Sequence, residues 1–76
     1  MKEFIAYLVK NLVDKPESVD VQLIEGDQGA TLEVRVAPED VAKVVGRQGK
    51  IVKSLRTIAM TVGARSGARV RLELIQ

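Results

Sequence analysis

The sequence predicts an α+β domain in which three helices cover one face of a three-stranded mixed sheet. Two observations lead to this prediction: apolar residues recur at helical spacing in three segments, and they alternate with polar residues in three others. Along the chain the segments follow the order helix, strand, strand, helix, helix, strand. The 76 residues, of which 46% are hydrophobic, suit one domain, residues 1–76, without a deep enclosed active site.

The N-terminal segment is predicted to form an amphipathic helix that ends before Pro16, at Asp14 and Lys15. Proline cannot continue a helix because it has no backbone N–H and its ring clashes with the preceding turn. The apolar residues of the segment share one helical face: Phe4, Ile5, Leu8, Val9, Leu12 and Val13.

Three segments alternate between apolar and polar residues, as strands with one buried face do. The first two, residues 19–23 and 32–36, flank the sequence EGDQGA, so we expect a hairpin with an acidic, glycine-containing loop at residues 25–30. The third strand is expected at residues 69–74. The apolar positions of the three strands are Val19, Val21, Leu23, Leu32, Val34, Val36, Val70, Leu72 and Leu74.

Two helices are predicted between the second and third strands. The shorter begins at Pro38, which suits a first turn, and ends at Gly46. The longer covers residues 50–62, with Gly63 as its terminator. Because this connection crosses the sheet, the third strand is expected to lie parallel to the second. The apolar stripe of the longer helix consists of Ile51, Val52, Leu55, Ile58, Ala59 and Val62.

Charge is segregated along the chain. Residues 1–40 contain nine of the ten acids and four bases, whereas residues 41–76 contain eight bases and one acid, so the net charges are −5 and +7. No acid occurs between Asp40 and Glu73. This asymmetry creates a local positive field suited to a polyanion. The bases in that interval are Lys43, Arg47, Lys50, Lys53, Arg56, Arg65, Arg69 and Arg71.

The composition excludes most catalytic and metal-binding constellations. Without cysteine or histidine there is no disulfide, no thiolate site and no imidazole base. The carboxylates show no paired spacing, so we expect no enzyme, no metal and no cofactor. No apolar run approaches the roughly 20 residues that span a bilayer, so we expect no membrane insertion and a cytoplasmic location.

The sequence VVGRQGKIVKSL, residues 44–55, places Gly46 and Gly49 between the two later helices. Glycines permit positive φ angles and close approach of another backbone. The amides and dipole at the start of the following helix, with the charges of Arg47 and Lys50, favour a phosphate chain there. A simple helix cap and turn is the alternative interpretation of the glycines alone. The acid-free basic context favours the phosphate site.

Three other nucleotide-binding or nucleic-acid-binding motifs fit this sequence poorly. A P-loop has four residues between its glycines and follows a strand. A DNA-binding helix-turn-helix presents polar residues early in its second helix, where this chain has Ile51 and Val52. An RNA-recognition-motif sheet carries aromatic residues on its strands, and Phe4 and Tyr7 are the only aromatics here.

The aliphatic pair, the GxxG and the basic helix that follows resemble the KH-domain signature, and the element order resembles the type II KH fold over essentially the whole chain. A KH domain of this size resembles the small bacterial RNA-binding proteins of the KhpA type. The resemblance implies non-catalytic binding of single-stranded RNA, with the loop clamping about four nucleotides beside a shallow aliphatic and basic groove. The RNA-binding residues it implies are Val36, Lys43, Val45, Gly46, Arg47, Gln48, Gly49, Lys50, Lys53 and Arg56. Apolar side chains such as Val36 and Val45 are usually core residues, which is their alternative role.

The resemblance also implies pairing, as a homodimer or with a larger KH-containing protein of the Jag type, in post-transcriptional regulation and cell shape. The alternative function is a protein–protein adaptor that uses the KH fold mainly for dimerisation. An advance of about 100° per residue places Met60 opposite the apolar stripe, near Lys53 and Arg56. We therefore expect a dimer interface at these three residues, although single exposed apolar residues are common. Pairing could supply a second clamp or occlude both grooves.

Overall fold

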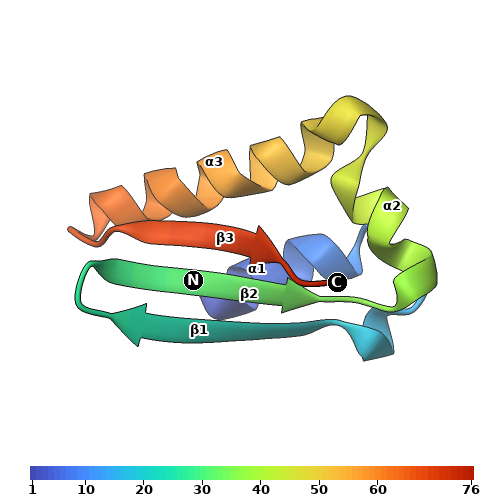
Figure 1. Ribbon diagram of the computed structural model, residues 1–76, viewed down its shortest axis with the longest axis horizontal. Helices are drawn as coiled ribbons and strands as arrows, with labels where there is room; N and C mark the ends of the chain where they lie inside the picture. Colours follow the sequence, from blue (N-terminus) through green and yellow to red (C-terminus); the bar gives the residue numbers. More distant parts are fainter.

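The computed structural model describes residues 1–76 and confirms the predicted α+β architecture (Figure 1). In chain order the helices and strands are α1 (Lys2–Lys10), β1 (Asp20–Gly26), β2 (Gly29–Arg35), α2 (Val41–Val45), α3 (Lys50–Arg65) and β3 (Val70–Leu74). Short 3₁₀ turns lie at Pro16–Ser18, Pro38–Asp40 and Arg47–Gly49. The shorter predicted helix is therefore divided into a 3₁₀ turn and α2.

The sheet has the order β1-β2-β3 and mixed direction. Strands β1 and β2 are antiparallel, with Val21 opposite Val34, and β3 lies parallel to β2, with Leu72 opposite Leu32. The parallel pairing confirms the prediction drawn from the helical crossover. The arrowheads of β2 and β3 point toward α2, so the loop between α2 and α3 lies at that end of the molecule (Figure 1).

The hydrophobic core lies between the sheet and the helices that cover one of its faces. Ile5 and Val9 of α1 and Val52 and Leu55 of α3 pack with the inward-facing residues of all three strands. Alternation leaves the opposite face of the sheet polar except at Ile24, because the residues between the buried ones point away from the core. The strand residues buried in the core are Val21, Leu32, Val34, Val70 and Leu72.

The face of α3 that contacts the sheet differs from the predicted stripe. Its buried residues are Val52, Leu55, Ala59 and Gly63, whereas Val62 is 36% exposed. Small residues occupy the centre of this face, which allows the helix to lie close to β3. A β-carbon at Gly63 would lie 2.6 Å from Cγ2 of Val70, so this glycine is a packing residue within the helix. The prediction that Gly63 terminates the helix was wrong.

Helix α3 ends two residues later in a Schellman motif. The backbone N–H of Ala68 donates to the carbonyl oxygen of Gly63 at 2.8 Å, and that of Gly67 donates to Ala64 at 3.0 Å. Gly67 has a φ of 76°, the left-handed conformation that this motif requires. Gly67 therefore takes the terminating role that the sequence pattern assigned to Gly63.

Two other predicted boundaries were wrong. Helix α1 ends at Lys10, before the predicted end at Asp14 and Lys15, because Asn11 begins a turn in which its side-chain amide donates to the carbonyl of Tyr7 at 2.8 Å. In the hairpin only Asp27 and Gln28 lie outside the strands, since Gly26 pairs with Gly29 in the ladder. The acidic loop is thus a tight turn instead of a six-residue connection.

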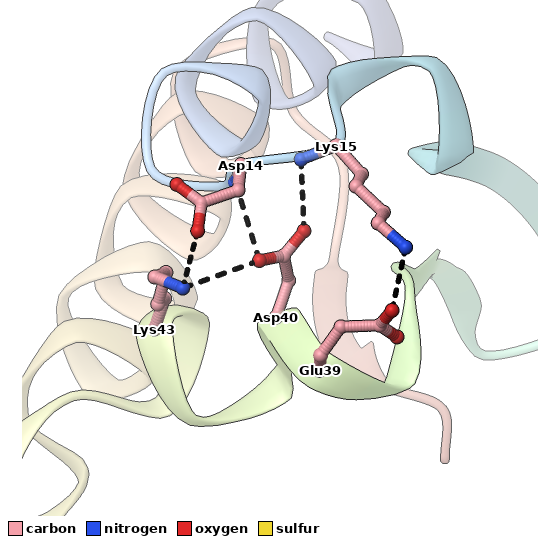
Figure 2. Close-up of polar contacts among 5 residues, drawn as sticks. All are labelled: Asp14, Lys15, Glu39, Asp40 and Lys43. Atoms are coloured by element: carbon pink, nitrogen blue, oxygen red, sulfur yellow. Dashed lines mark hydrogen bonds and ion pairs between the residues drawn. The ribbon is translucent and has the colours of Figure 1, made fainter.

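Asp40 joins α2 to the segment after α1 (Figure 2). Its carboxylate is fully buried and accepts hydrogen bonds from the backbone N–H groups of Asp14, at 3.2 Å, and Lys15, at 3.0 Å. Nζ of Lys43 lies 2.7 Å from Asp14 and 3.5 Å from Asp40, and Lys15 pairs with Glu39. These contacts hold the start of α2, the helix that leads into the GxxG loop.

The environment of Asp40 favours its charged form. Burial raises the pKa of this carboxyl, but the backbone hydrogen bonds from Asp14 and Lys15, together with the charge of Lys43, outweigh burial and place the pKa below its ordinary value of 3.8. A carboxyl with a lowered folded pKa stabilises the fold above its unfolded pKa, and this stabilisation is lost as pH falls through the folded pKa.

We expect Asp40→Asn to lower the thermal midpoint at neutral pH. Each oxygen of the Asp40 carboxylate accepts one backbone N–H, whereas the asparagine amide has only one oxygen, so its NH₂ group would face one of these N–H donors. The difference from the unsubstituted protein should shrink as pH falls from about 5 to below 3.8, where Asp40 itself becomes protonated. Thermal unfolding at a series of pH values measures this. Asp14→Asn, at an exposed side chain, is the control and should have a smaller effect. A difference that is independent of pH would refute the role of the Asp40 charge.

Candidate nucleic-acid interface

The connection between α2 and α3 turns through three residues with positive φ. Gly46 has φ 78° and ψ 174°, Gln48 has φ 59° and ψ 24°, and Gly49 has φ 75° and ψ 14°. The N–H of Gly46 closes α2 on Ala42 at 2.9 Å, and the N–H of Gly49 donates to the carbonyl of Gly46 at 3.1 Å. Both glycines therefore use the positive φ angles that glycine permits.

The two glycines have different surroundings. A β-carbon at Gly46 would lie 2.5 Å from Cγ1 of Ile51, so this position is filled by the following helix. A β-carbon at Gly49 would meet no atom within 4 Å, so that side of the loop is open. Between them the side chains of Arg47 and Gln48 are exposed. The loop therefore packs inward at its first glycine and leaves backbone accessible at its second.

An apolar groove of about 680 Å³ lies between α2 and the carboxyl ends of β2 and β3. Val36 and Val45, which the sequence analysis placed in one groove, both line it. Three of the residues that line the groove, Pro38, Val41 and Val45, recur at helical spacing in α2 and the turn before it. This spacing could have identified more of the groove from the sequence. The lining residues that sequence reasoning missed are Arg35, Pro38, Val41, Ala42, Ile75 and Gln76.

The C-terminal wall of the groove depends on backbone pairing just after β3. The N–H of Ile75 donates to the carbonyl of Val34 at 2.9 Å, which continues the parallel ladder beyond Leu74. This hydrogen bond holds Ile75 beside the end of β2, where Val36 is half-buried. The alternation of residues 69–74 predicted the strand but gave no indication that the next residue would line a groove.

Four predicted cations surround the start of α3 without compensating acids. Arg47, Lys50, Lys53 and Arg56 are exposed, and no carboxylate oxygen lies within 4.0 Å of any of them. Arg56 is directed toward β3, where its Nε donates to the carbonyl of Leu72 at 3.4 Å. The loop and the first turns of α3 therefore carry positive charge available to an anionic ligand.

Lys43 differs from the other predicted cations. Its ammonium pairs with Asp14 and Asp40, and the hydrogen bond to Asp14 raises its pKa (Figure 2). The side chain remains 45% exposed. Its contact with RNA stays a prediction, but its charge is already balanced by two acids, so it contributes less to the field around the loop than Lys50 or Lys53.

Met60 is exposed as expected, at 53%, but its direction differs from the prediction. Because the buried face of α3 is centred on Leu55 and Ala59, Met60 lies about 100° around the helix from it, beside β3 rather than opposite the core. There it lines a hollow of about 320 Å³ with Arg56, Arg71, Leu72 and Glu73. This hollow is the groove between α3 and the free edge of β3.

The KhpA/KhpB KH-domain family matches residues 2–74. The chain belongs to this family. Similar proteins named RNA-binding protein KhpA occur in Chlamydia pneumoniae, with 41% identity over 76 residues, and in Clostridium perfringens, with 41% identity over 75 residues. The first alignment covers 100% of this chain and 97% of the relative, and the second covers 99% and 100%.

A solved structure shares the fold of this KhpA/KhpB-family domain. The crystal structure of Era from Aquifex aeolicus aligns with a TM-score of 0.61 and 20% sequence identity. The alignment covers 96% of this chain and 28% of the Era chain. The similarity therefore concerns the fold of one part of a longer protein.

Two kinds of feature are absent from this KhpA/KhpB-family domain. None of its helices combines the length and the apolar character that crossing a bilayer requires. No group of three or more acidic side chains is arranged to hold a metal ion.

We expect the two loop glycines of this KhpA/KhpB-family domain to differ in their tolerance of alanine. Gly46→Ala should lower the free energy of unfolding by about 3 kcal/mol, because it combines a backbone conformation restricted to glycine with a clash against Ile51. Gly49→Ala should cost about 1 kcal/mol, since only its left-handed φ opposes a side chain. Urea unfolding measures both values. Equal costs would contradict the inward packing of Gly46.

Proposed function

We propose that this domain binds single-stranded RNA without catalysis, holding about four nucleotides of backbone at residues 46–49. One observation carries the proposal: two exposed side chains, Arg47 and Gln48, stand between two positive-φ glycines beside an apolar groove. Relatives similar over their full length are named RNA-binding protein KhpA, which supports the same function.

In the proposed complex the phosphates lie against the loop and the start of α3. The dipole of this 16-residue helix favours negative charge at its N-terminus, and Arg47 and Lys50 add formal charge beside it. Lys53 and Arg56 continue the positive surface along α3. The bases face the groove at Val36 and Val45, with Arg35 as a further polar contact at its rim.

Affinity in this proposal is weak for one domain and sensitive to salt. The groove carries no aromatic side chain on which bases could stack, since Phe4 and Tyr7 both belong to α1. Binding then depends on a few phosphate contacts, each of which contributes a slope of about −0.7 in a plot of log affinity against log salt concentration.

We further propose that the domain pairs through the flank of α3 that carries Met60, with Arg56 and Lys53 at the edge of the contact. A two-fold dimer uses the same patch twice, and an adaptable methionine suits such an interface. Its partner is a second copy or a larger KH-containing protein of the Jag type, in post-transcriptional regulation and cell shape. Two weak clamps on one RNA gain avidity that a single clamp lacks.

We expect the double substitution Arg47→Asp and Gln48→Asp to abolish binding of single-stranded RNA. Two carboxylates would repel phosphate at the point of closest approach. The free energy of unfolding should change by less than about 0.5 kcal/mol, because both side chains are exposed and aspartate tolerates the left-handed conformation of residue 48. Gel-shift titration measures affinity and urea unfolding measures stability.

The matched control is Lys2→Asp with Ser18→Asp, which makes the same change in net charge at exposed positions of α1 and of the 3₁₀ turn that follows it. It should retain most of the RNA affinity. If the loop variant binds RNA as well as the unsubstituted protein does, the RNA function is refuted and the adaptor function becomes the better explanation.

Met60→Asp should convert a dimer to a monomer at micromolar concentration, because a desolvated carboxylate in the contact opposes association. Thr61→Asp, at the next exposed position on α3, is the control and should remain dimeric. Sedimentation equilibrium distinguishes the two states. An unsubstituted protein that is monomeric, or a dimer unaffected by Met60→Asp, would exclude this interface.

A further inference from the structure

A second basic surface lies at the end of the molecule opposite the GxxG loop. A hollow of about 340 Å³ is formed there by the hairpin turn and the start of β3. Only one of its seven lining residues is hydrophobic, so the hollow is polar. We call it the distal arginine surface and define it by Gly26, Gln28, Gly29, Ala30, Thr31, Arg69 and Arg71.

The arginines at this end are largely uncompensated. Neither Arg65 nor Arg69 has a carboxylate oxygen within 4.0 Å, and Arg71 has only Glu73, at 3.7 Å between two side chains that are 71% and 52% exposed. Such an exposed contact contributes little and leaves the guanidinium free for other partners. Two acids lie close by, since Glu25 lines an adjoining hollow with Arg69 and Asp27 stands in the hairpin turn, but neither carboxylate is within 4.0 Å of an arginine nitrogen.

The backbone that carries the two arginines is held by close contacts. The N–H of Ala30 donates to the carbonyl of Arg69 at 2.8 Å. A β-carbon at Gly29 would lie 2.3 Å from that carbonyl oxygen, so the hairpin meets the start of β3 with no space between them. Because Val70 and Leu72 are buried, Arg69 and Arg71 project to the other side, where Thr31 stands beside Arg71 in the ladder.

The position of the surface determines what could reach it. The GxxG loop precedes α3 and the distal arginine surface follows it, at the two ends of the view in Figure 1. A 16-residue helix is about 24 Å long, so a ligand confined to the four-nucleotide clamp does not reach Arg69. Only an extended polyanion can occupy both sites.

The path between the two ends is mainly basic, with Glu73 as the acid among the residues that line it. Arg56 and Arg71 line one hollow beside Met60, and Arg69 and Arg71 line the next one along the edge of β3. We propose that the distal arginine surface binds the sugar–phosphate backbone of the same RNA strand, several nucleotides beyond the clamp. This inference rests on the proposed RNA-binding function and assigns Arg69 and Arg71 as phosphate contacts outside the KH groove.

The test compares two RNA lengths. One probe has about four nucleotides, enough for the clamp alone, and the other has about twelve, within the range that extended single-strand sites occupy. The unsubstituted protein should bind the longer probe more tightly and with a steeper salt dependence. Arg69→Gln with Arg71→Gln should weaken binding of the longer probe about tenfold and reduce its salt slope by about 1.4, the value for two phosphates. The affinity for the shorter probe should not change.

Lys2→Gln with Lys10→Gln is the matched control, since it removes the same charge from exposed positions of α1. It should leave the difference between the two probes intact. If the arginine variant keeps the affinity and salt slope of the longer probe, or weakens both probes equally, the distal arginine surface is refuted while the clamp stands. If the unsubstituted protein binds neither probe, the proposed RNA-binding function itself fails, and this inference fails with it.

Discussion

The conformation of Gly46 is the constraint on which the candidate interface depends. Its φ of 78° and ψ of 174° belong to a region open essentially to glycine, and the side chain of Ile51 occupies the space that a β-carbon would need. This contact folds the start of α3 against the end of α2 and leaves Arg47 and Gln48 on the outside. Since Ile51 also packs against the core, the shape of the loop is tied to the packing of α3 on the sheet. A polyanion would meet a surface that is already formed, so most of the ordering cost of binding would fall on the polyanion.

The charge segregation seen in the sequence persists in three dimensions as one compensated and one uncompensated region. Near the start of α2, acids and bases neutralise one another, as Lys43 does with Asp14 and Asp40. Along α3 and at the start of β3, most cations have no carboxylate partner. Asp14, Glu39 and Asp40 therefore stabilise the scaffold, whereas most of the bases that follow α2 remain available. The net charge of the protein is only +2, but this division makes its electrostatic field positive on the α3 side. An anion is therefore attracted to the protein from that side.

Hydrophobic periodicity predicted the helices and strands whose formation depends on burial. It failed at helix ends that are set by a single contact. Strand β3 was predicted within one residue of its observed bounds, Val70–Leu74, because its alternation is uninterrupted. The ends of α1 and α3 were not, since Asn11 and Gly63 take part in a side-chain hydrogen bond and a close helix–strand contact that no pattern encodes. The GxxG loop was recognisable from its spacing. Most of the groove was not, because it is formed by α2 and by residues such as Ile75 that meet only through the tertiary fold.

Pairing through α3 and RNA contact at the distal arginine surface involve neighbouring side chains, because Met60 and Arg71 line the same hollow. In a two-fold dimer that buries Met60, each copy would bring its Arg71 to the rim of the contact, and like charges facing one another there oppose association. A phosphate backbone bound at that rim would neutralise the repulsion. If both proposals hold, RNA and the second copy therefore favour one another, and by linkage the dimer binds RNA more tightly by the same factor by which RNA strengthens the dimer. The flank of α3 would then couple the two functions instead of forcing a choice between them.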